Sequence, residues 1–365
     1  MSIWDKNLAN ASLQSLVPYE PGKPIDDVAR EFGLDPASVI KLASNENPLG
    51  PSPKAIEASK AFLENAHIYP DGGGYHLREA IAEDHQLSKD QVILGNGSNE
   101  IIELSYHAFT QPGQSSVVAS RYAFVVYKLM AQLFNVEMIE VPDSDFQHDL
   151  EAMLEAIRPD TKMIFIASPN NPTGTRIPDT EIVAFLEKVP SSVIVILDEA
   201  YYEFLPDAPP SIQWLERFPQ LILTRTFSKI QGLAALRIGY GLAHPEIAGV
   251  LQRCRQPFNA NAIAQAAALA SYQDKEHQSK TAEMTLAGRD RLEAFARQHQ
   301  IHYIPSEANF VMMKTGEADR IFSELQQKGV IIRSLSSYGL PDWIRVSIGT
   351  PEEMTRFESE ILEVI

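Results

Sequence analysis

Four polar side chains lie at or just beyond the ends of strongly apolar segments. Asn171, Asp198 and Lys229 each follow a run rich in valine, isoleucine or leucine, and Tyr201 comes three residues after Asp198. Runs of this kind are typical of buried strands in a mostly parallel sheet. Ligands bind in the crevice outside the carboxyl ends of such strands. We therefore expect these four side chains to share one pocket.

The surroundings of Asp198 and Lys229 suggest what that pocket could hold. Asp198 directly follows five aliphatic residues, Val193 to Leu197, and a buried carboxylate without a partner would take up a proton instead of staying charged. A ring nitrogen that carries a proton is one suitable partner. Lys229 stands among small and apolar residues, so it is either a surface charge or an amine held where it can react.

A second group of residues is suited to binding phosphate. The segment 93–104, ILGNGSNEIIEL, predicts a strand, a glycine loop and a helix, so the amides of Gly97, Ser98 and Asn99 would point at an anion from a helix N-terminus. Ser228 and Arg237 could complete the cradle. The loop lacks the third glycine of a dinucleotide fingerprint, and no G-K-[ST] sequence occurs. A lysine, a partner for a ring nitrogen, donors for a phenolic oxygen and a phosphate cradle together describe pyridoxal phosphate.

The pattern along the chain predicts an α/β fold. From about residue 53, helix-like segments alternate with the short apolar runs 91–95, 115–120, 163–168, 193–200, 221–226 and 238–243. The stretch 256–298 indicates a long, alanine-rich helix, interrupted at most by Gly288, and the strand and helix patterns after it indicate a smaller α+β domain. We expect an N-terminal arm at 1–40, a large domain at 41–255, and a connecting helix with a small C-terminal domain at 256–365.

Composition limits the classes of partner. The 365 residues carry a formal net charge of −17, which would repel nucleic acid and anionic membrane surfaces. Cys254 is the only cysteine, and the nine histidines show no metal-binding spacing. We therefore expect no metal site. No run approaches 18 apolar residues and the first 24 residues do not resemble a leader, so we also expect a cytoplasmic protein.

Several motifs in one order resemble those of fold-type I pyridoxal-phosphate aminotransferases, and most of all the histidinol-phosphate aminotransferases. They are SNENPLGPSP, YPDGGGYHLREAI, GNGSNE, SPNNPTG, DEAYYEF, TFSKIQGLAALRIGY, ANFVMM and IRVSIGTPEE, and the resemblance runs from about residue 16 to the C-terminus. It implies a large domain with a mostly parallel central sheet flanked by helices, the cofactor pyridoxal 5'-phosphate, and a homodimer with shared active sites.

The resemblance also implies a role for each cofactor-binding residue. Lys229 would form a Schiff base with the cofactor and later move a proton, and Asp198 would keep the pyridine nitrogen protonated. The remaining contacts would come from Asn171 and Tyr201 at the phenolic oxygen, Ser98, Asn99, Ser228 and Arg237 at the phosphate, Phe124 stacked on the ring, and Tyr69 at the phosphate of the partner's cofactor. Tyr122 is the alternative to Phe124, because RYAFVVY departs from the family pattern.

Substrate binding is implied by three further residues. In this family a substrate phosphate is held by residues that match Arg333, Arg345 and Tyr19. The implied reaction is ping-pong transamination between L-histidinol phosphate and 2-oxoglutarate, giving imidazole-acetol phosphate and L-glutamate in histidine biosynthesis. An aromatic amino acid transaminase for phenylalanine or tyrosine is the first alternative, and a threonine-phosphate decarboxylase is the second. A non-catalytic regulator on the same fold is a further alternative. Such regulators usually carry a DNA-binding segment before the aminotransferase-like part, whereas here a segment of only about forty residues, not basic overall, stands there.

Overall fold

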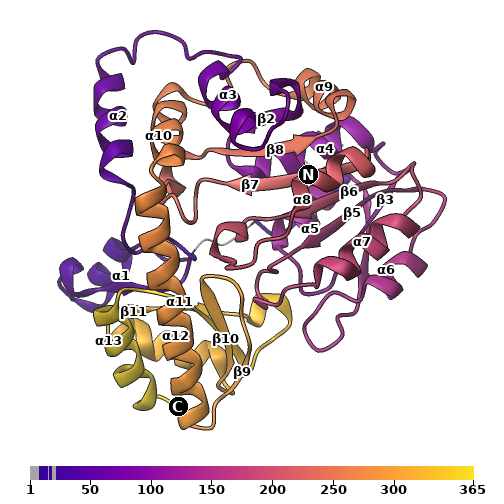
Figure 1. Cartoon of the computed structure of the whole chain (residues 1–365). Coiled ribbons are helices and arrows are strands. Elements are labelled where there is room, and N and C mark those ends of the chain that lie inside the picture. The colour runs from indigo at the N-terminus through magenta and orange to yellow at the C-terminus, as the bar shows by residue number, and fades with distance from the viewer. Residues whose placement is uncertain (1–7, 15, 19–21) are drawn as a thin grey trace.

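The structure is a computed structural model that describes residues 8–14, 16–18 and 22–365 (Figure 1). Its largest element is a seven-stranded sheet in the order β2-β8-β7-β6-β5-β3-β4. The strands are β2 (Val92–Gly95), β3 (Ser116–Ser120), β4 (Glu137–Val141), β5 (Thr161–Ala167), β6 (Ile194–Asp198), β7 (Leu221–Thr226) and β8 (Gly239–Ala243). The neighbours from β7 to β4 pair in parallel, whereas β8 is antiparallel to both β2 and β7. The expected α/β fold with a mostly parallel central sheet is confirmed.

Helices cover both faces of this sheet because its strands are apolar on both faces. Along β6, Val195 and Leu197 pack into one core, and Ile196 between them packs into a second core on the opposite face. Helices α3, α7, α8 and α10 contribute to the first core, and α4, α5 and α9 contribute to the second. The helices are α2 (Pro53–Leu63), α3 (Tyr75–Asp84), α4 (Ser98–Phe109), α5 (Val125–Leu133), α6 (Leu150–Glu155), α7 (Asp179–Lys188), α8 (Ser211–Arg217), α9 (Pro245–Cys254) and α10 (Ala262–Gln273).

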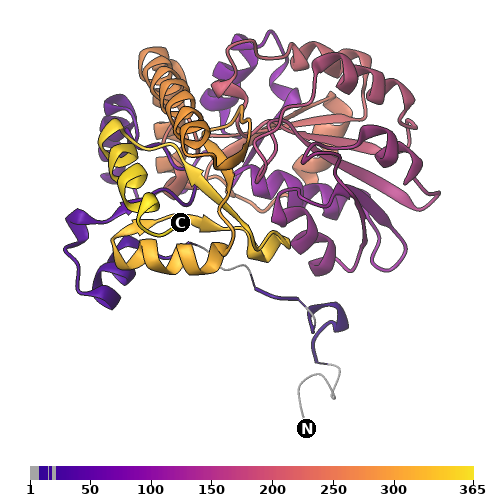
Figure 2. The same ribbon diagram turned by 90° about the horizontal axis from the view of Figure 1, so that it is seen from below.

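The C-terminal third forms a separate antiparallel sheet in the order β12-β13-β10-β9. Its elements are α11 (Lys275–Gln298), β9 (His302–Ile304), β10 (Phe310–Lys314), α12 (Ala318–Gln327), β12 (Arg333–Ser334), β13 (Trp343–Ser347) and α13 (Pro351–Leu362). Helix α1 (Ile25–Phe32) lies beside this C-terminal part in both views (Figures 1 and 2). A two-stranded parallel sheet joins β1 (Ile40–Lys41) to β11 (Val330–Ile331).

The expectation of one long helix over 256–298 is wrong in its details. Residues before 262 are not helical, and α10 and α11 are separated at Asp274, whose backbone angles (φ −89°, ψ 69°) leave the helical region. The Asp274 carboxylate pairs with Lys54 of α2 at 3.1 Å. Gly288 does not interrupt α11, and its missing side chain has another use: a Cβ there would lie 2.4 Å from Cγ2 of Ile348.

Helix α10 packs against α2 and α3, and α11 runs on to the smaller sheet (Figure 1). The domain boundaries at residues 40 and 255 stay predictions. Among the described residues there is no helix long and apolar enough to cross a membrane, and no cluster of side chains suited to hold a metal ion.

Candidate active site

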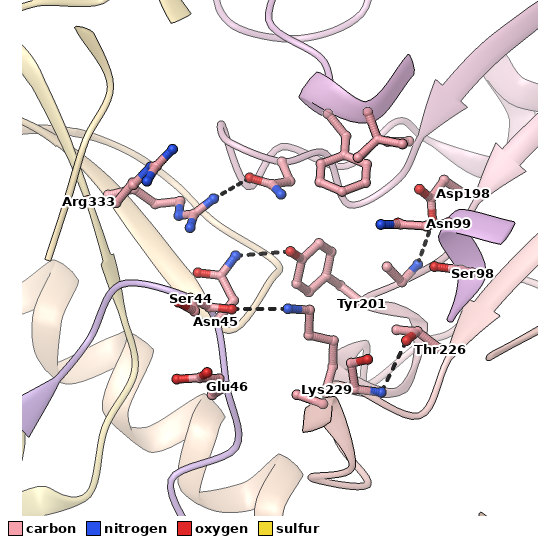
Figure 3. A pocket seen from close by; sticks show the side chains of 18 of the residues that line it. Ser44, Asn45, Glu46, Ser98, Asn99, Asp198, Tyr201, Thr226, Lys229 and Arg333 are labelled. Atoms are coloured by element: carbon pink, nitrogen blue, oxygen red, sulfur yellow. Dashed lines mark hydrogen bonds between the residues drawn. The ribbon is translucent and has the colours of Figure 1, made fainter. Parts of the chain in front are cut away.

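A cavity of about 470 Å³ opens at the carboxyl ends of the large sheet's parallel strands, where it meets the smaller sheet. Its size lies within the ~300–1,000 Å³ range of small-molecule sites. Eleven of the residues expected from the sequence line it: Ser98, Asn99, Phe124, Asn171, Asp198, Tyr201, Ser228, Lys229, Arg237, Arg333 and Arg345. Figure 3 shows Arg333 on one side of the cavity and Asp198 with Ser98 on the other, with Tyr201 and Lys229 between them in this view.

Lys229 lies in the turn that follows β7, and its amine points into the cavity. Its Nζ donates a hydrogen bond to the carbonyl oxygen of Ser44 at 3.2 Å (Figure 3). Removal from water lowers the pKa of this lysine to about 8, and the positive charge of Arg345 contributes to the same shift. At this pKa about a tenth of the amine is uncharged at pH 7. The uncharged form is the one that a nucleophile or a proton acceptor requires.

Asp198 is the last residue of β6 and is 5% exposed. Its Oδ2 accepts a hydrogen bond from the Tyr127 hydroxyl at 2.8 Å, and its Oδ1 accepts one from the amide of Ala200 at 3.2 Å. Burial raises the pKa of this carboxyl. A carboxylate oxygen can accept more than one hydrogen bond, so Asp198 retains the capacity to bind a cationic N–H group.

Tyr201 and Asn171 are two hydrogen-bond donors that line the cavity. Asn45 donates to the Tyr201 hydroxyl at 2.9 Å, which leaves the hydroxyl proton of Tyr201 available to another acceptor. Burial raises the pKa of Tyr201 to about 12, so it keeps this proton at neutral pH. Arg345 donates a hydrogen bond to Oδ1 of Asn171 at 2.5 Å. This contact orients the Asn171 amide, whose NH₂ group then remains available as a donor.

An anion cradle forms around the first turn of α4, which has Gly97 before it and Ser98 as its first residue. A Cβ on Gly97 would lie 2.5 Å from a guanidinium nitrogen of Arg237, and a Cβ on Gly239 would lie 2.4 Å from the Ser98 amide nitrogen. The two glycines thus leave room for the arginine and the helix N-terminus to come together. Arg237 NH1 also lies 3.5 Å from Oγ of Ser228. A guanidinium, a hydroxyl and helix-terminal amides are the donors that a phosphate requires.

Phe124 precedes α5 and lines the cavity. Tyr122, the alternative as the stacking residue, instead stacks on Phe146 with ring centroids 5.7 Å apart, and it does not line the cavity. The position of Phe124 at the cavity favours it over Tyr122 as the residue that would stack on the cofactor ring.

One of the expected residues is placed elsewhere, and another falls outside the described residues. Tyr69 does not line the cavity; it is 79% exposed and stacks on Phe258 at 4.8 Å. Tyr19 lies outside the described residues.

The structure also brings in residues to which the sequence analysis gave no role in the site, namely Tyr127, which donates to Asp198, and the segment 43–46. The carbonyl of Ala43 accepts from Arg345 at 2.7 Å, Ser44 accepts from Lys229, and Asn45 donates to Tyr201. The motif SNENPLGPSP begins at Ser44, so the resemblance already marked most of this segment without assigning it a contact. Tyr127 matched an aromatic position of the family, but the sequence gave no sign of its hydrogen bond to Asp198.

Comparison with known proteins gives consistent results. The family model described as "Aminotransferase class I and II" matches residues 37–361. The chain is 46% identical over 360 residues to "Histidinol-phosphate aminotransferase 2" of Nitrosospira multiformis, covering 98% of this chain and 91% of that protein. It is 44% identical over 361 residues to "Histidinol-phosphate aminotransferase" of Akkermansia muciniphila, covering 99% of both.

Solved structures show the same architecture. The histidinol-phosphate aminotransferase of Sinorhizobium meliloti, solved in complex with pyridoxal-5'-phosphate, superposes with a TM-score of 0.90 at 28% identity, covering 98% of this chain and 97% of that one. An aspartate aminotransferase of Thermus thermophilus, solved with maleate, superposes with a TM-score of 0.83 at 21% identity, covering 98% of this chain and 99% of that one. The second likeness concerns the fold alone.

Proposed function

The chain belongs to the class I and II aminotransferases, and from this premise we propose that it transfers the amino group of L-histidinol phosphate to 2-oxoglutarate with pyridoxal phosphate as cofactor. The products are imidazole-acetol phosphate and L-glutamate, and the reaction serves histidine biosynthesis. The relatives that carry the name histidinol-phosphate aminotransferase support this assignment.

One observation carries the choice of substrate. Arg333 and Arg345 are direct cross-strand partners on β12 and β13, and both line the cavity that holds Lys229. Like charges directly opposite each other in a sheet are destabilising, so the pair favours an anion between or beside them. A phosphate dianion suits two guanidinium groups better than a single carboxylate does. Histidinol phosphate carries such a group where an amino acid has its carboxylate.

Pyridoxal phosphate, when bound, supplies an aldehyde that takes the amino group and a ring that accepts electrons from the substrate carbon. The chain has a donor or acceptor for each polar part of that molecule. Asp198 would accept a hydrogen bond from the protonated ring nitrogen, and Tyr201 and Asn171 would donate hydrogen bonds to the phenolic oxygen. The amides of Ser98 and Asn99, with Ser228 and Arg237, would hold the phosphate, and Phe124 would cover one face of the ring.

Lys229 has two tasks that follow from its uncharged fraction near neutral pH. Its Nζ would hold the cofactor as the attaching amine. The same amine, when free, would serve as the base that takes a proton from the substrate carbon and gives it back. The carbonyl of Ser44, 3.2 Å from Nζ, gives the released amine a hydrogen-bond acceptor close to the reacting atoms.

We also propose a homodimer in which Tyr69 reaches the partner's site. Tyr69 is highly exposed, and Leu63, Ile68 and Phe258 nearby are 56%, 57% and 45% exposed. Exposed large apolar side chains that gather in this way are typical of an interaction surface. Light scattering of the purified protein should give twice the chain mass, and a monomer would contradict the proposal. A role for Tyr19 at the substrate phosphate and the cytoplasmic location stay predictions.

A steady-state assay tests the proposed reaction. Purified enzyme loaded with pyridoxal phosphate is given 2-oxoglutarate with histidinol phosphate, phenylalanine or threonine phosphate, and glutamate and CO₂ are measured. We expect the highest kcat/KM for glutamate formation with histidinol phosphate. A higher value with phenylalanine would favour the aromatic transaminase, and CO₂ release from threonine phosphate would favour the decarboxylase.

A further inference from the structure

A buried ion pair lies directly behind the strand ends that carry Asp198 and Lys229, and the mechanism above does not use it. Glu199 and Arg225 are 1% and 2% exposed, and Nε of Arg225 donates to Oε2 of Glu199 at 2.9 Å. Successive side chains of a strand point to opposite faces of the sheet. Glu199 therefore turns away from the cavity that Asp198 faces.

The pair occupies a defined position in the sheet. Strands β6 and β7 are in parallel register up to Asp198 and Thr224. The amide of Glu199 then donates to the carbonyl of Thr224 at 2.9 Å. One step further along the same register, Glu199 stands opposite Arg225. The Glu199–Arg225 ion pair thus lies one position beyond the last paired residues of β6 and β7. The loops that carry the site residues begin just after this position.

The guanidinium of Arg225 is fixed on several sides. Its Cζ lies 3.5 Å from the centroid of the Tyr202 ring, NH1 lies 3.4 Å from Nε2 of His85, and NH2 lies 3.4 Å from Oγ of Ser211. Glu203, Tyr240 and Tyr272 are further titratable groups whose charges interact with it. An arginine held at this many points has one orientation, and so has the carboxylate that it binds.

Burying two charges is costly, and neutral side chains of similar size often stabilise a protein equally well. A buried pair is therefore weak evidence for a role in stability. Its location is more informative, because Glu199 is bonded to Asp198 and Arg225 precedes Lys229 by four residues.

We propose that the Glu199–Arg225 pair is a positioning element for the reaction, which holds the carboxylate of Asp198 and the turn bearing Lys229 in fixed register at the ends of β6 and β7. Arg225 also offsets the negative charge of Glu199 beside Asp198. The two residues act through their neighbours and do not touch the substrate. The proposal rests on the proposed function for its effect on turnover, but its effect on cofactor binding is independent of the substrate.

The test compares two doubly substituted enzymes. Glu199→Gln with Arg225→Met removes both charges at similar volume. Glu358→Gln with Arg291→Met makes the same changes in a pair between α13 and α11, where Arg291 donates to both carboxylate oxygens of Glu358 at 2.8 and 2.7 Å. The measurements are the melting temperature, the Kd of pyridoxal phosphate, the kcat and KM for the amino donor, and the pH midpoint of the bound cofactor's absorbance change.

For the Glu199/Arg225 variant we expect kcat to fall and the cofactor Kd to rise by about tenfold or more, with KM changed by less than about twofold. The pH midpoint should shift by about half a unit or more, because the carboxylate of Asp198 is no longer held in one position relative to the cofactor. The Glu358/Arg291 control should keep all of these values. Unchanged kcat, Kd and pH midpoint, or equal changes in the control, would overturn the proposal and leave a pair that serves stability alone.

Arg225→Lys provides a second test should the doubly neutral variant fail to fold. It keeps the positive charge but loses the paired contact in which both Nε and NH2 of Arg225 lie 2.9 Å from Oε2 of Glu199. A lower kcat with a higher cofactor Kd supports the proposal, and wild-type values overturn it. Should wild-type enzyme not convert histidinol phosphate, the proposed function fails, but Kd and the pH midpoint still decide on the pair.

Discussion

Replacing Arg333 by methionine should weaken the reaction of histidinol phosphate far more than that of phenylalanine. Arg333 and Arg345 face the same cavity from neighbouring strands, and Arg345 alone contacts Asn171 and Ala43. A phosphate dianion would use both guanidinium groups, whereas the carboxylate of phenylalanine would use Arg345. Methionine retains most of the apolar stem and removes only the charged head.

The size of the loss follows from the contact that is removed. A hydrogen bond to a charged group contributes about 1.5–3 kcal/mol, which corresponds to about a 10- to 150-fold fall in kcat/KM for histidinol phosphate. The fall for phenylalanine should stay within about threefold, because its carboxylate does not depend on this residue. The assay is initial-rate kinetics with both amino donors at a fixed concentration of 2-oxoglutarate.

Arg320→Met is the matched control, since Arg320 lies on α12 and pairs with Glu317 and Glu324 at the surface. It should leave kcat/KM unchanged for both donors. Equal losses for the two donors in Arg333→Met would refute the reasoning, because they would show that Arg333 supports the fold or binds the carboxylate.

Four further predictions concern Lys229, Tyr127 and Gly288, two of them at Lys229. Lys229→Ala should keep the fold and bind pyridoxal phosphate only loosely, with no detectable turnover; turnover near the wild-type rate would exclude Lys229 as the reacting amine. In the cofactor-free enzyme the pKa of Lys229 is lowered to about 8, so the amine is mostly protonated below that pH and mostly free above it. The rate of cofactor attachment should therefore rise as the pH increases through about 8 and level off above it, and a rate that is flat from pH 6 to 10 would contradict this assignment. Tyr127→Phe removes the donor to Oδ2 of Asp198 and should weaken cofactor binding by about tenfold, measured by titration, because the carboxylate loses its orientation. Gly288→Ala places a Cβ against Ile348 and should lower the free energy of unfolding by about 1–3 kcal/mol with little change in kcat; an unchanged denaturation midpoint would show that α11 moves aside freely.

The sequence predicted the fold where the burial of a segment was uniform. The runs at 163–168, 193–200 and 221–226 are apolar on both faces, and each covers all or most of a central strand of the large sheet. Strand β4 was missed because it is an edge strand, in which Glu137 and Glu140 are exposed and break the apolar run. The end of α10 at Asp274 was missed because it depends on packing between helices, which composition does not reveal.

The site was predictable to the extent that its residues follow strands or glycine loops. Asp198, Lys229 and the segment at Ser98 all lie at such positions, so topology alone brings them together. Tyr127 was not predictable from the chain, because a tyrosine in an amphipathic helix has the same pattern whether it packs in the core or donates to a buried carboxylate. The contact between Arg345 and Ala43 joins residues 302 positions apart and depends on how the two sheets meet.

The most direct test of the proposed reaction is its first half, observed without the second substrate. Enzyme loaded with pyridoxal phosphate is mixed rapidly with histidinol phosphate or with phenylalanine, and the loss of the cofactor's initial absorbance is followed in a single turnover. The site with two arginines predicts that the second-order rate constant of this half-reaction is at least about tenfold higher for histidinol phosphate than for phenylalanine. A faster reaction with phenylalanine, or no absorbance change with histidinol phosphate, would contradict the proposed function.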